Sequence, residues 1–340
     1  MSRYLVTGGT GFLGRYLVEQ LSAADHEVVA LCRSESSALA DLGATIHVGD
    51  VLDGGSIRDA ATDCDGLFHC AGKVSRDGAD AESMYRVHVD GTKTTLDAAR
   101  SAGIKRAVVA STSGVVAVSS DPDELRDEEA DTPMAEIARW PYYRSKLFAE
   151  RAAFDRNDPQ FEVIAVNPSL LLGPGDLRNS STDDIRLFLE RKIPFCPAGG
   201  IAFVDARDAA AALILAMEKG KAGERYLVNA ANMTVQAFFG RLERISGVKA
   251  PPFRLPRTSA TIAGVSASLL GKAAKLFSME PPLDKISAEM SQFYWYCDST
   301  KAETELGWTC RDPNETLADT VEDLEARGVV WPRQRARGAS

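Results

Sequence analysis

The sequence has few of the residues that build metal sites and disulfide frameworks. Its 340 residues include six cysteines and four histidines. No two cysteines form a Cys-x-x-Cys pair, and no histidine accompanies them at the spacing of metal ligands. We therefore expect no zinc or other metal site, and we expect reduced thiols in a cytoplasmic protein.

Long apolar runs and an excess of positive charge are also missing. No apolar stretch reaches the roughly 18 residues that a membrane span needs. The nearest candidate, 258–277, is interrupted by two glycines and a lysine, and it is read as an amphipathic helix. The net charge is −9, and the basic end at 332–340 is short. We expect neither a stable membrane span nor nucleic acid as a partner.

Short apolar runs alternate with helical patterns in the first half of the chain. The predicted strands lie at 3–8, 27–33, 45–50, 66–72, 106–113 and 161–169. Strands that alternate with helices favour right-handed crossovers and a parallel sheet with both faces covered. After Pro168 the pattern changes to loops and helices. A further strand and helix follow within 201–220, with Asp208 placed as the helix N-cap.

A glycine-rich turn follows the first predicted strand. Residues 6–14 read VTGGTGFLG, with Gly8, Gly11 and Gly14 between the strand and a predicted helix. In such a segment the first glycine permits the tight turn, the second lets a pyrophosphate approach, and the third lets the helix pack closely. Free N–H groups at the helix start bind phosphate. The segment therefore predicts a dinucleotide site.

The end of the second predicted strand indicates which dinucleotide is preferred. NAD enzymes usually place a carboxylate there, on the ribose 2′-hydroxyl. This chain instead has Cys32, Arg33 and Ser34. A guanidinium matches the geometry of a phosphate, so Arg33 favours NADP(H), with NAD(H) as the alternative. Arg33 can also be read as an exposed turn residue.

A tyrosine and a lysine lie four residues apart in the segment 142–146, which reads YYRSK. On a helix, Tyr142 and Lys146 share a face. A neighbouring ammonium lowers the pKa of a tyrosine from its ordinary value of ~10. Such a tyrosine passes a proton to or from a carbonyl or carbinol oxygen. The pair follows the strand ending in 110–113 (ASTS), where a hydroxyl can polarise the same oxygen.

Six segments resemble, in order and spacing, the extended short-chain dehydrogenase/reductases. They are TGGTGFLG (7–14), HVGDVLD (47–53), FHCAG (68–72), ASTSG (110–114), YYRSK (142–146) and VNPSLLLGPG (166–175). The resemblance covers about 1–310, including DSTKAETELGW at 298–308. The chain looks most like the dihydroflavonol-reductase-like branch, which also contains hydroxysteroid-dehydrogenase-like enzymes and proteins called hopanoid-associated sugar epimerases.

The resemblance implies roles for the matching residues. Tyr142 would be the general acid/base, and Lys146 would be its electrostatic partner and the anchor of the cofactor ribose. The implied cofactor contacts are Gly8, Thr10, Gly11, Phe12 and Leu13 at the pyrophosphate, Asp50 and Val51 at the adenine, Cys70, Ala71, Gly72 and Lys73 behind the ribose, and Pro168 and Ser169 beside the nicotinamide.

Two positions in this comparison stay open. Thr112 falls where the family has its catalytic serine or threonine, but an alignment one residue longer selects Ser113. His88 stands where the family usually has an asparagine that helps a relay behind the lysine. Either proton delivery differs in this chain, or His88 is a packed helix histidine.

We favour an NADP(H)-dependent oxidoreductase that transfers a hydride between nicotinamide and the carbonyl or secondary alcohol of a largely apolar small molecule, a ketone or aldehyde. That reaction needs an apolar cap, for which the candidates are Leu170, Leu171, Leu172, Phe188, Phe195 and 292–296. The substrate itself, the direction of the reaction and a homodimeric state stay open.

Two other functions remain. A nucleotide-sugar epimerase or dehydratase with bound NAD needs cations for a diphosphate. Arg178, Arg186 and Arg191 are available, although they form no phosphate-binding pattern. A non-catalytic NADP-binding regulator is disfavoured by the intact Tyr142 and Lys146.

These observations together predict an α/β protein with a doubly wound parallel sheet of Rossmann type. Residues 1–169 and 201–233 are assigned to the NADP-binding domain. Residues 170–200 and 234–331 are assigned to a smaller, mostly helical substrate cap, and 332–340 to a flexible tail.

Overall fold

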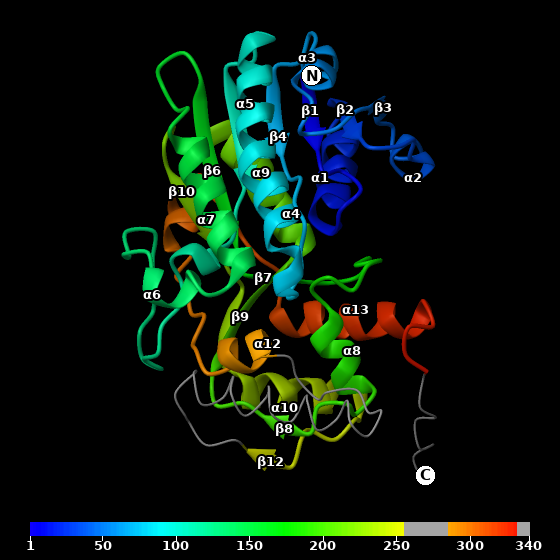
Figure 1. Ribbon diagram of the computed structural model, residues 1–340. Coiled ribbons are helices and arrows are strands. Elements are labelled where there is room, and N and C mark those ends of the chain that lie inside the picture. Colours follow the sequence, from blue (N-terminus) through cyan, green and yellow to red (C-terminus); the bar gives the residue numbers. More distant parts are fainter. Residues whose placement is uncertain (255–284, 332–340) are drawn as a thin grey trace.

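The structure is a computed structural model that describes residues 1–254 and 285–331 (Figure 1). The segment 258–277 and the tail 332–340 lie outside the described residues. Within the described ranges, no helix combines the length and the apolar character needed to cross a bilayer.

Seven parallel strands form the main sheet, in the order β10-β6-β5-β4-β1-β2-β3. They are β1 (Arg3–Thr7), β2 (Glu27–Cys32), β3 (Thr45–Val48), β4 (Gly66–His69), β5 (Arg106–Ala110), β6 (Glu162–Pro168) and β10 (Arg225–Val228). From β1 the chain adds β2 and β3 on one side, and then crosses over to add β4, β5, β6 and β10 on the other side. The strand order therefore reverses between β1 and β4. Open α/β sheets bind ligands at the carboxyl ends of the strands beside such a switch point. The predicted doubly wound parallel sheet is confirmed.

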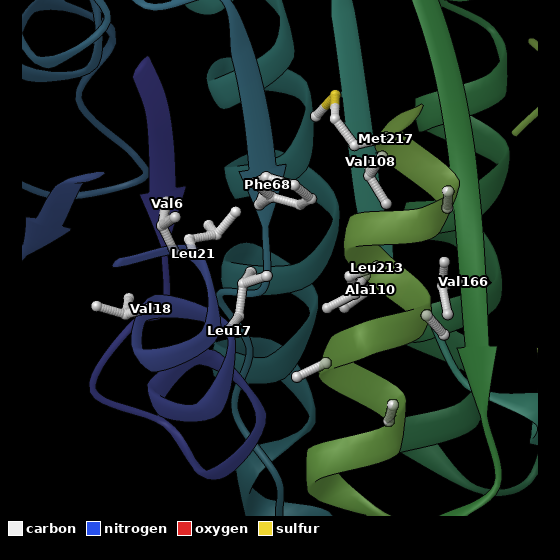
Figure 2. Close-up of a cluster of buried hydrophobic side chains, with 14 of the residues drawn as sticks. Val6, Leu17, Val18, Leu21, Phe68, Val108, Ala110, Val166, Leu213 and Met217 are labelled. Atoms are coloured by element: carbon white, nitrogen blue, oxygen red, sulfur yellow. The ribbon is translucent and has the colours of Figure 1, made fainter. Parts of the chain in front are cut away.

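Helices cover both faces of this sheet. On one face lie α1 (Phe12–Ala23) and α9 (Ala206–Lys219), and on the other lie α3 (Gly54–Ala60), α5 (Gly91–Ser101) and α7 (Pro141–Phe154). Figure 2 shows the first face, where apolar side chains of the strands and of both helices meet. They include Val6, Phe68, Val108 and Val166 of the sheet and Leu17, Leu21, Leu213 and Met217 of the helices.

The helical stretch between β4 and β5 contains a wider turn. It consists of α4 (Ala81–Tyr85), the π-helical segment η2 (Arg86–Asp90) and α5. A π-helical turn inserts an extra residue, and such turns occur frequently at functional sites. This one carries His88 into the interior, where the side chain is buried.

A smaller group of elements lies below the main sheet in Figure 1. Three strands form a second sheet: β7 (Leu170–Leu172), β9 (Gly200–Asp205) and β11 (Ala231–Thr234). Around it pack α8 (Asp183–Leu189), α10 (Val235–Ser246) and α13 (Pro313–Ala326), which share an apolar cluster that includes Phe188, Phe203 and Phe238. The shorter elements are α2 (Ser37–Ala40), η1 (Gly78–Asp80), η3 (Ser113–Val115), α6 (Met134–Ile137), β8 (Phe195–Cys196), β12 (Phe253–Arg254), α12 (Lys285–Met290) and η4 (Ala302–Leu306).

Three local expectations differ from the structure. Residues 170–172, expected in a loop, form β7 because they pair with β9. The N-cap of α9 is Asp205, whose carboxylate accepts a hydrogen bond from the Arg207 amide at 2.9 Å. Asp208, the predicted cap, lies in the first turn of α9 and binds Arg311. Residues 302–308, assigned to the cap by the sequence, place Leu306 and Trp308 in the core of the main sheet.

Candidate active site

One cavity of about 1070 Å³ lies at the carboxyl ends of β1, β4, β5 and β6. All the site residues predicted from the sequence line it: Gly8, Thr10, Gly11, Phe12, Leu13, Arg33, Asp50, Val51, Cys70, Ala71, Gly72, Lys73, Thr112, Tyr142, Lys146, Pro168 and Ser169. Residues from seven separate parts of the chain are thereby brought to one place. Among the described residues, in this cavity and outside it, no group of three or more His, Cys, Asp or Glu side chains could hold a metal ion.

The glycine turn between β1 and α1 fits a dinucleotide. Gly8 has a positive φ of 74°, and a Cβ there would lie 2.5 Å from the Cys70 carbonyl carbon. A Cβ at Gly14 would overlap the Gly8 carbonyl oxygen, so α1 reaches this position only without a side chain. Gly11 is the N-cap of α1 and supplies no side-chain cap. The first N–H groups of the helix are therefore open to a phosphate.

One end of the cavity carries the cationic side chain of Arg33. Arg33 directly follows β2, is exposed and lines the cavity. Asp50 follows β3, and its carboxylate accepts a hydrogen bond from the Leu52 amide at 2.9 Å. Neither Cys32 nor Ser34 beside Arg33 supplies the carboxylate that a 2′-hydroxyl would need. A guanidinium at this place matches the geometry of a phosphate.

Lys146 lies in the interior at the first turns of α7. Its ammonium donates a hydrogen bond to the Ala110 carbonyl at 2.6 Å. Burial lowers the pKa of Lys146 to about 8, although Glu150 and Cys70 raise it. The lysine is therefore mostly charged at neutral pH.

The pKa of Tyr142 is not lowered, contrary to the expectation from the neighbouring Lys146. Burial raises the pKa of Tyr142 to about 12, and no neighbouring charge offsets this effect. The expectation was wrong in direction, because removal from water disfavours the charged phenolate. At neutral pH the hydroxyl keeps its proton, which suits a donor of protons to a substrate oxygen.

The two candidate hydroxyls have different surroundings. Thr112 is the N-cap of η3, half-buried, and its hydroxyl accepts a long hydrogen bond of 3.4 Å from the Gly114 amide. Ser113 is buried and hydrogen-bonds to the Cys297 thiol, whose pKa burial raises to about 12 while this bond lowers it. Of the two hydroxyls, that of Thr112 thus has the weaker hydrogen bond within the protein and is better able to bond to a substrate oxygen.

His88 forms a bridge between two segments of the site. Its Nε2 accepts a hydrogen bond from the Lys73 amide at 3.0 Å, so its Nδ1 carries the proton and donates to Ser145 Oγ at 2.8 Å. Ser145 in turn donates to the Tyr142 carbonyl. Burial, followed by Lys146, lowers the pKa of His88 to about 2. A neutral imidazole with both nitrogens hydrogen-bonded joins the segment of Lys73 to that of Ser145.

An aromatic wall, formed by Trp140, Tyr143 and Trp295, faces the cavity beside Tyr142. The ring centroids of Tyr143 and Trp295 are 4.9 Å apart, and those of Trp140 and Trp295 are 5.6 Å apart. A side chain at Gly114 would overlap the Tyr143 ring, so this glycine allows the wall to form. The wall brings apolar surface to within one residue of the predicted acid.

The predicted apolar cap is partly different. Leu170 and Leu171 line the cavity, and so does Trp295 of 292–296. Leu172 and Phe188 lie in the apolar cluster behind it, and Phe195 forms β8. The sequence missed Leu187, Ile193, Phe238, Phe239, Ile286 and Met290, which also line the cavity. These positions depend on how α8, α10 and α12 pack, and no local motif marks them.

The sequence also missed an ion pair at the cavity. Arg76 donates two hydrogen bonds to Asp184 of α8, at 3.1 and 2.9 Å, and both residues line the cavity. The pair joins the loop after β4 to the smaller group of elements. Neither residue lies in a segment with a recognisable motif.

Comparisons with known proteins agree with this site. A model of the NAD dependent epimerase/dehydratase family matches residues 4–229. A Synechocystis protein provisionally named dihydroflavonol 4-reductase is 33% identical over 338 residues, which are 96% of each chain. Sterol demethylase protein B of Methylococcus capsulatus is 31% identical over 330 residues, 96% of this chain and 99% of the relative.

A solved structure, that of gox2253, has the same fold with a TM-score of 0.82 at 28% identity. The match covers 96% of this chain and 99% of the other. The chain therefore belongs to the NAD-dependent epimerase/dehydratase family, and within it to the extended short-chain dehydrogenase/reductases, which are NAD(P)-dependent enzymes.

Proposed function

We propose that this enzyme is an NADP(H)-dependent reductase of an apolar ketone or aldehyde that carries a ring system. The observation that carries the proposal is the aromatic wall directly beside Tyr142. A flat apolar substrate can bury one face against these rings while its carbonyl oxygen meets the tyrosine hydroxyl. The names of two relatives specify a dihydroflavonol and a sterol, which supports an apolar, ring-bearing substrate.

In this function the cofactor supplies the hydride when it is bound. Gly8, Gly11 and the start of α1 bind its pyrophosphate. Tyr142 donates its proton to the substrate oxygen as negative charge develops there. Thr112 donates a hydrogen bond to the same oxygen, and Lys146 supplies a positive charge nearby. The apolar lining keeps water away from the reacting carbonyl.

The nucleotide-sugar alternative is less well supported by the cations of the cavity. Arg186 is occupied by Asp183 and Glu190, both at 2.7 Å, and does not line the cavity. Arg76 is held by Asp184, as described above. A diphosphate in the substrate half would have to break that pair or rely on Arg178. Our proposal therefore places the reductase first and epimerase or dehydratase chemistry second.

The choice of cofactor is tested at Arg33. In the Arg33→Ala variant we expect NADPH affinity to fall roughly ten- to hundredfold, because a charge-assisted bond to the 2′-phosphate is lost. NADH affinity should stay unchanged and serves as the internal control. Calorimetric titration of both enzymes with both cofactors measures this. Equal affinity of the unaltered enzyme for NADPH and NADH would exclude the preference.

The substrate class is tested at Trp295. In the Trp295→Ala variant we expect kcat/KM for ring-bearing ketones to fall roughly tenfold or more, because stacking surface is lost. Short aliphatic ketones should lose much less. Trp331→Ala is the matched control, since that side chain is 90% exposed and does not line the cavity. An equal loss for both ketone classes would mean that the wall does not select the substrate.

A further inference from the structure

A buried carboxylate lies one helical turn beyond Lys146. Glu150 is on α7, four residues after the lysine, and only 1% of it is exposed. Residues four apart share a face of a helix, so Glu150 lies behind the lysine as seen from the cavity. It does not itself line the cavity. The mechanism described above leaves this carboxylate without a role.

Glu150 connects the edge of the main sheet to the loop that carries Thr112. One carboxylate oxygen lies 3.1 Å from the Arg225 guanidinium of β10. The other accepts a hydrogen bond from the Asn167 side-chain amide of β6 at 2.7 Å. The same Asn167 amide group donates to the Thr112 carbonyl at 3.1 Å. Three elements are thus joined through one carboxylate.

Four other titratable groups lie around Lys146. They are His69 within β4, Cys70 directly after that strand, His88 of η2, and Tyr142 on α7. Burial lowers the pKa of His69 to about 3 and raises that of Cys70 to about 12. His88 is neutral and Tyr142 is protonated, as shown above. Of the two groups that raise the pKa of Lys146, Glu150 has the larger effect and Cys70 the smaller.

We propose that Glu150 is a positioning residue of the acid–base site: it keeps the Lys146 ammonium charged and, through Asn167, holds the Thr112 backbone in place. A buried ammonium is costly unless an opposite charge faces it. The Arg225 guanidinium forms an ion pair with the same carboxylate. The charge on Lys146 therefore depends on the balance between Glu150 and Arg225. The inference rests on the role of Lys146 in the proposed function, but it can be tested without a substrate.

The test is a pH titration of Lys146 by NMR, on full-length enzyme labelled with ¹³C at the lysine Cε. The Lys146 signal is identified by its loss in Lys146→Met. We expect a midpoint of about 8 in the unaltered enzyme. In Glu150→Gln, which keeps an oxygen for Asn167, it should fall by about one pH unit or more.

Variants of Arg225 should shift the Lys146 midpoint in the opposite direction. Arg225→Met removes a competing positive charge, so the midpoint should rise, whereas Arg225→Lys keeps the charge and should leave it within a few tenths of a unit. A purely structural role for Glu150 does not produce shifts in opposite directions. Should Glu150→Gln fail to fold, the Arg225 pair alone decides the question.

Turnover gives the second readout once a substrate is known. The loss of kcat at alkaline pH should move in the same direction as the NMR midpoint in each variant. An NMR midpoint that stays unchanged in Glu150→Gln, or moves the same way in Arg225→Met, overturns the inference. Shifts of the expected sign in an enzyme that reduces no ketone would instead uphold the inference and count against the reductase.

Discussion

Replacing Tyr142 with phenylalanine should lower carbonyl-dependent NADPH oxidation by roughly two to four decades, the usual contribution of general acid–base catalysis. The variant keeps the ring and loses the hydroxyl. Burial raises the pKa of that hydroxyl to about 12, so it holds its proton at neutral pH, as the proposed donor must. Affinity for NADPH should stay nearly unchanged, because the missing group contacts the substrate oxygen. Initial rates across a panel of ring-bearing ketones and aldehydes, with calorimetry for the cofactor, measure both quantities.

The neighbouring tyrosine provides the control. Tyr143 packs its ring against Trp295 and Trp140, and this packing survives in Tyr143→Phe. That variant should be mild. Lys146→Met should weaken NADPH binding as well as turnover, because we expect the ammonium to hold the cofactor ribose. A Tyr142→Phe enzyme with near-normal turnover would remove the proposed mechanism.

Replacing Thr112 with valine should cost roughly a hundredfold or more in kcat, the effect of removing one donor to a developing oxyanion. Valine has nearly the shape of threonine, so packing around η3 is preserved. The hydrogen bond that the hydroxyl would donate to the substrate oxygen is lost. Thr112→Ser keeps a hydroxyl and should recover most of the activity. Steady-state kinetics on the same ketone panel measure the effect.

Ser113→Ala distinguishes the two possible alignments. The Ser113 hydroxyl is directed to the Cys297 thiol, so its loss should affect stability more than turnover. Thermal unfolding of each variant separates the two effects. If Ser113→Ala is inactive and Thr112→Val is active, the catalytic hydroxyl lies one residue later than proposed.

The main sheet was predictable because its signals are local. Apolar runs of strand length alternate with helical patterns, and the glycines at 8, 11 and 14 mark the first turn. The exceptions depend on distant partners. Residues 170–172 form a strand because β9 lies beside them. The N-cap of α9 is Asp205 and not the predicted Asp208, because β9 ends at Asp205 and α9 begins directly after it.

The site was predictable where a motif specifies it and not where packing builds it. Tyr142 and Lys146 are separated by one helical turn, so their common face follows from spacing alone. The pKa of Tyr142 was mispredicted because the sequence does not reveal how completely a ring is buried. Glu150 reaches Asn167 and Arg225 only after α7 has packed on the sheet. Arg76 likewise reaches the cavity together with Asp184, its ion-pair partner more than a hundred residues away.

The most direct test of the central claim follows the hydride itself. The enzyme is supplied with NADPH that carries deuterium at the hydride-donating carbon of its nicotinamide, together with a ring-bearing ketone, and the product is analysed by mass spectrometry. A reductase places a single deuterium on the new carbinol carbon for each NADPH oxidised. A nucleotide-sugar epimerase or dehydratase would instead show tightly bound NAD in the purified protein, no net oxidation of NADPH and no deuterium in any alcohol, and that result would contradict the account.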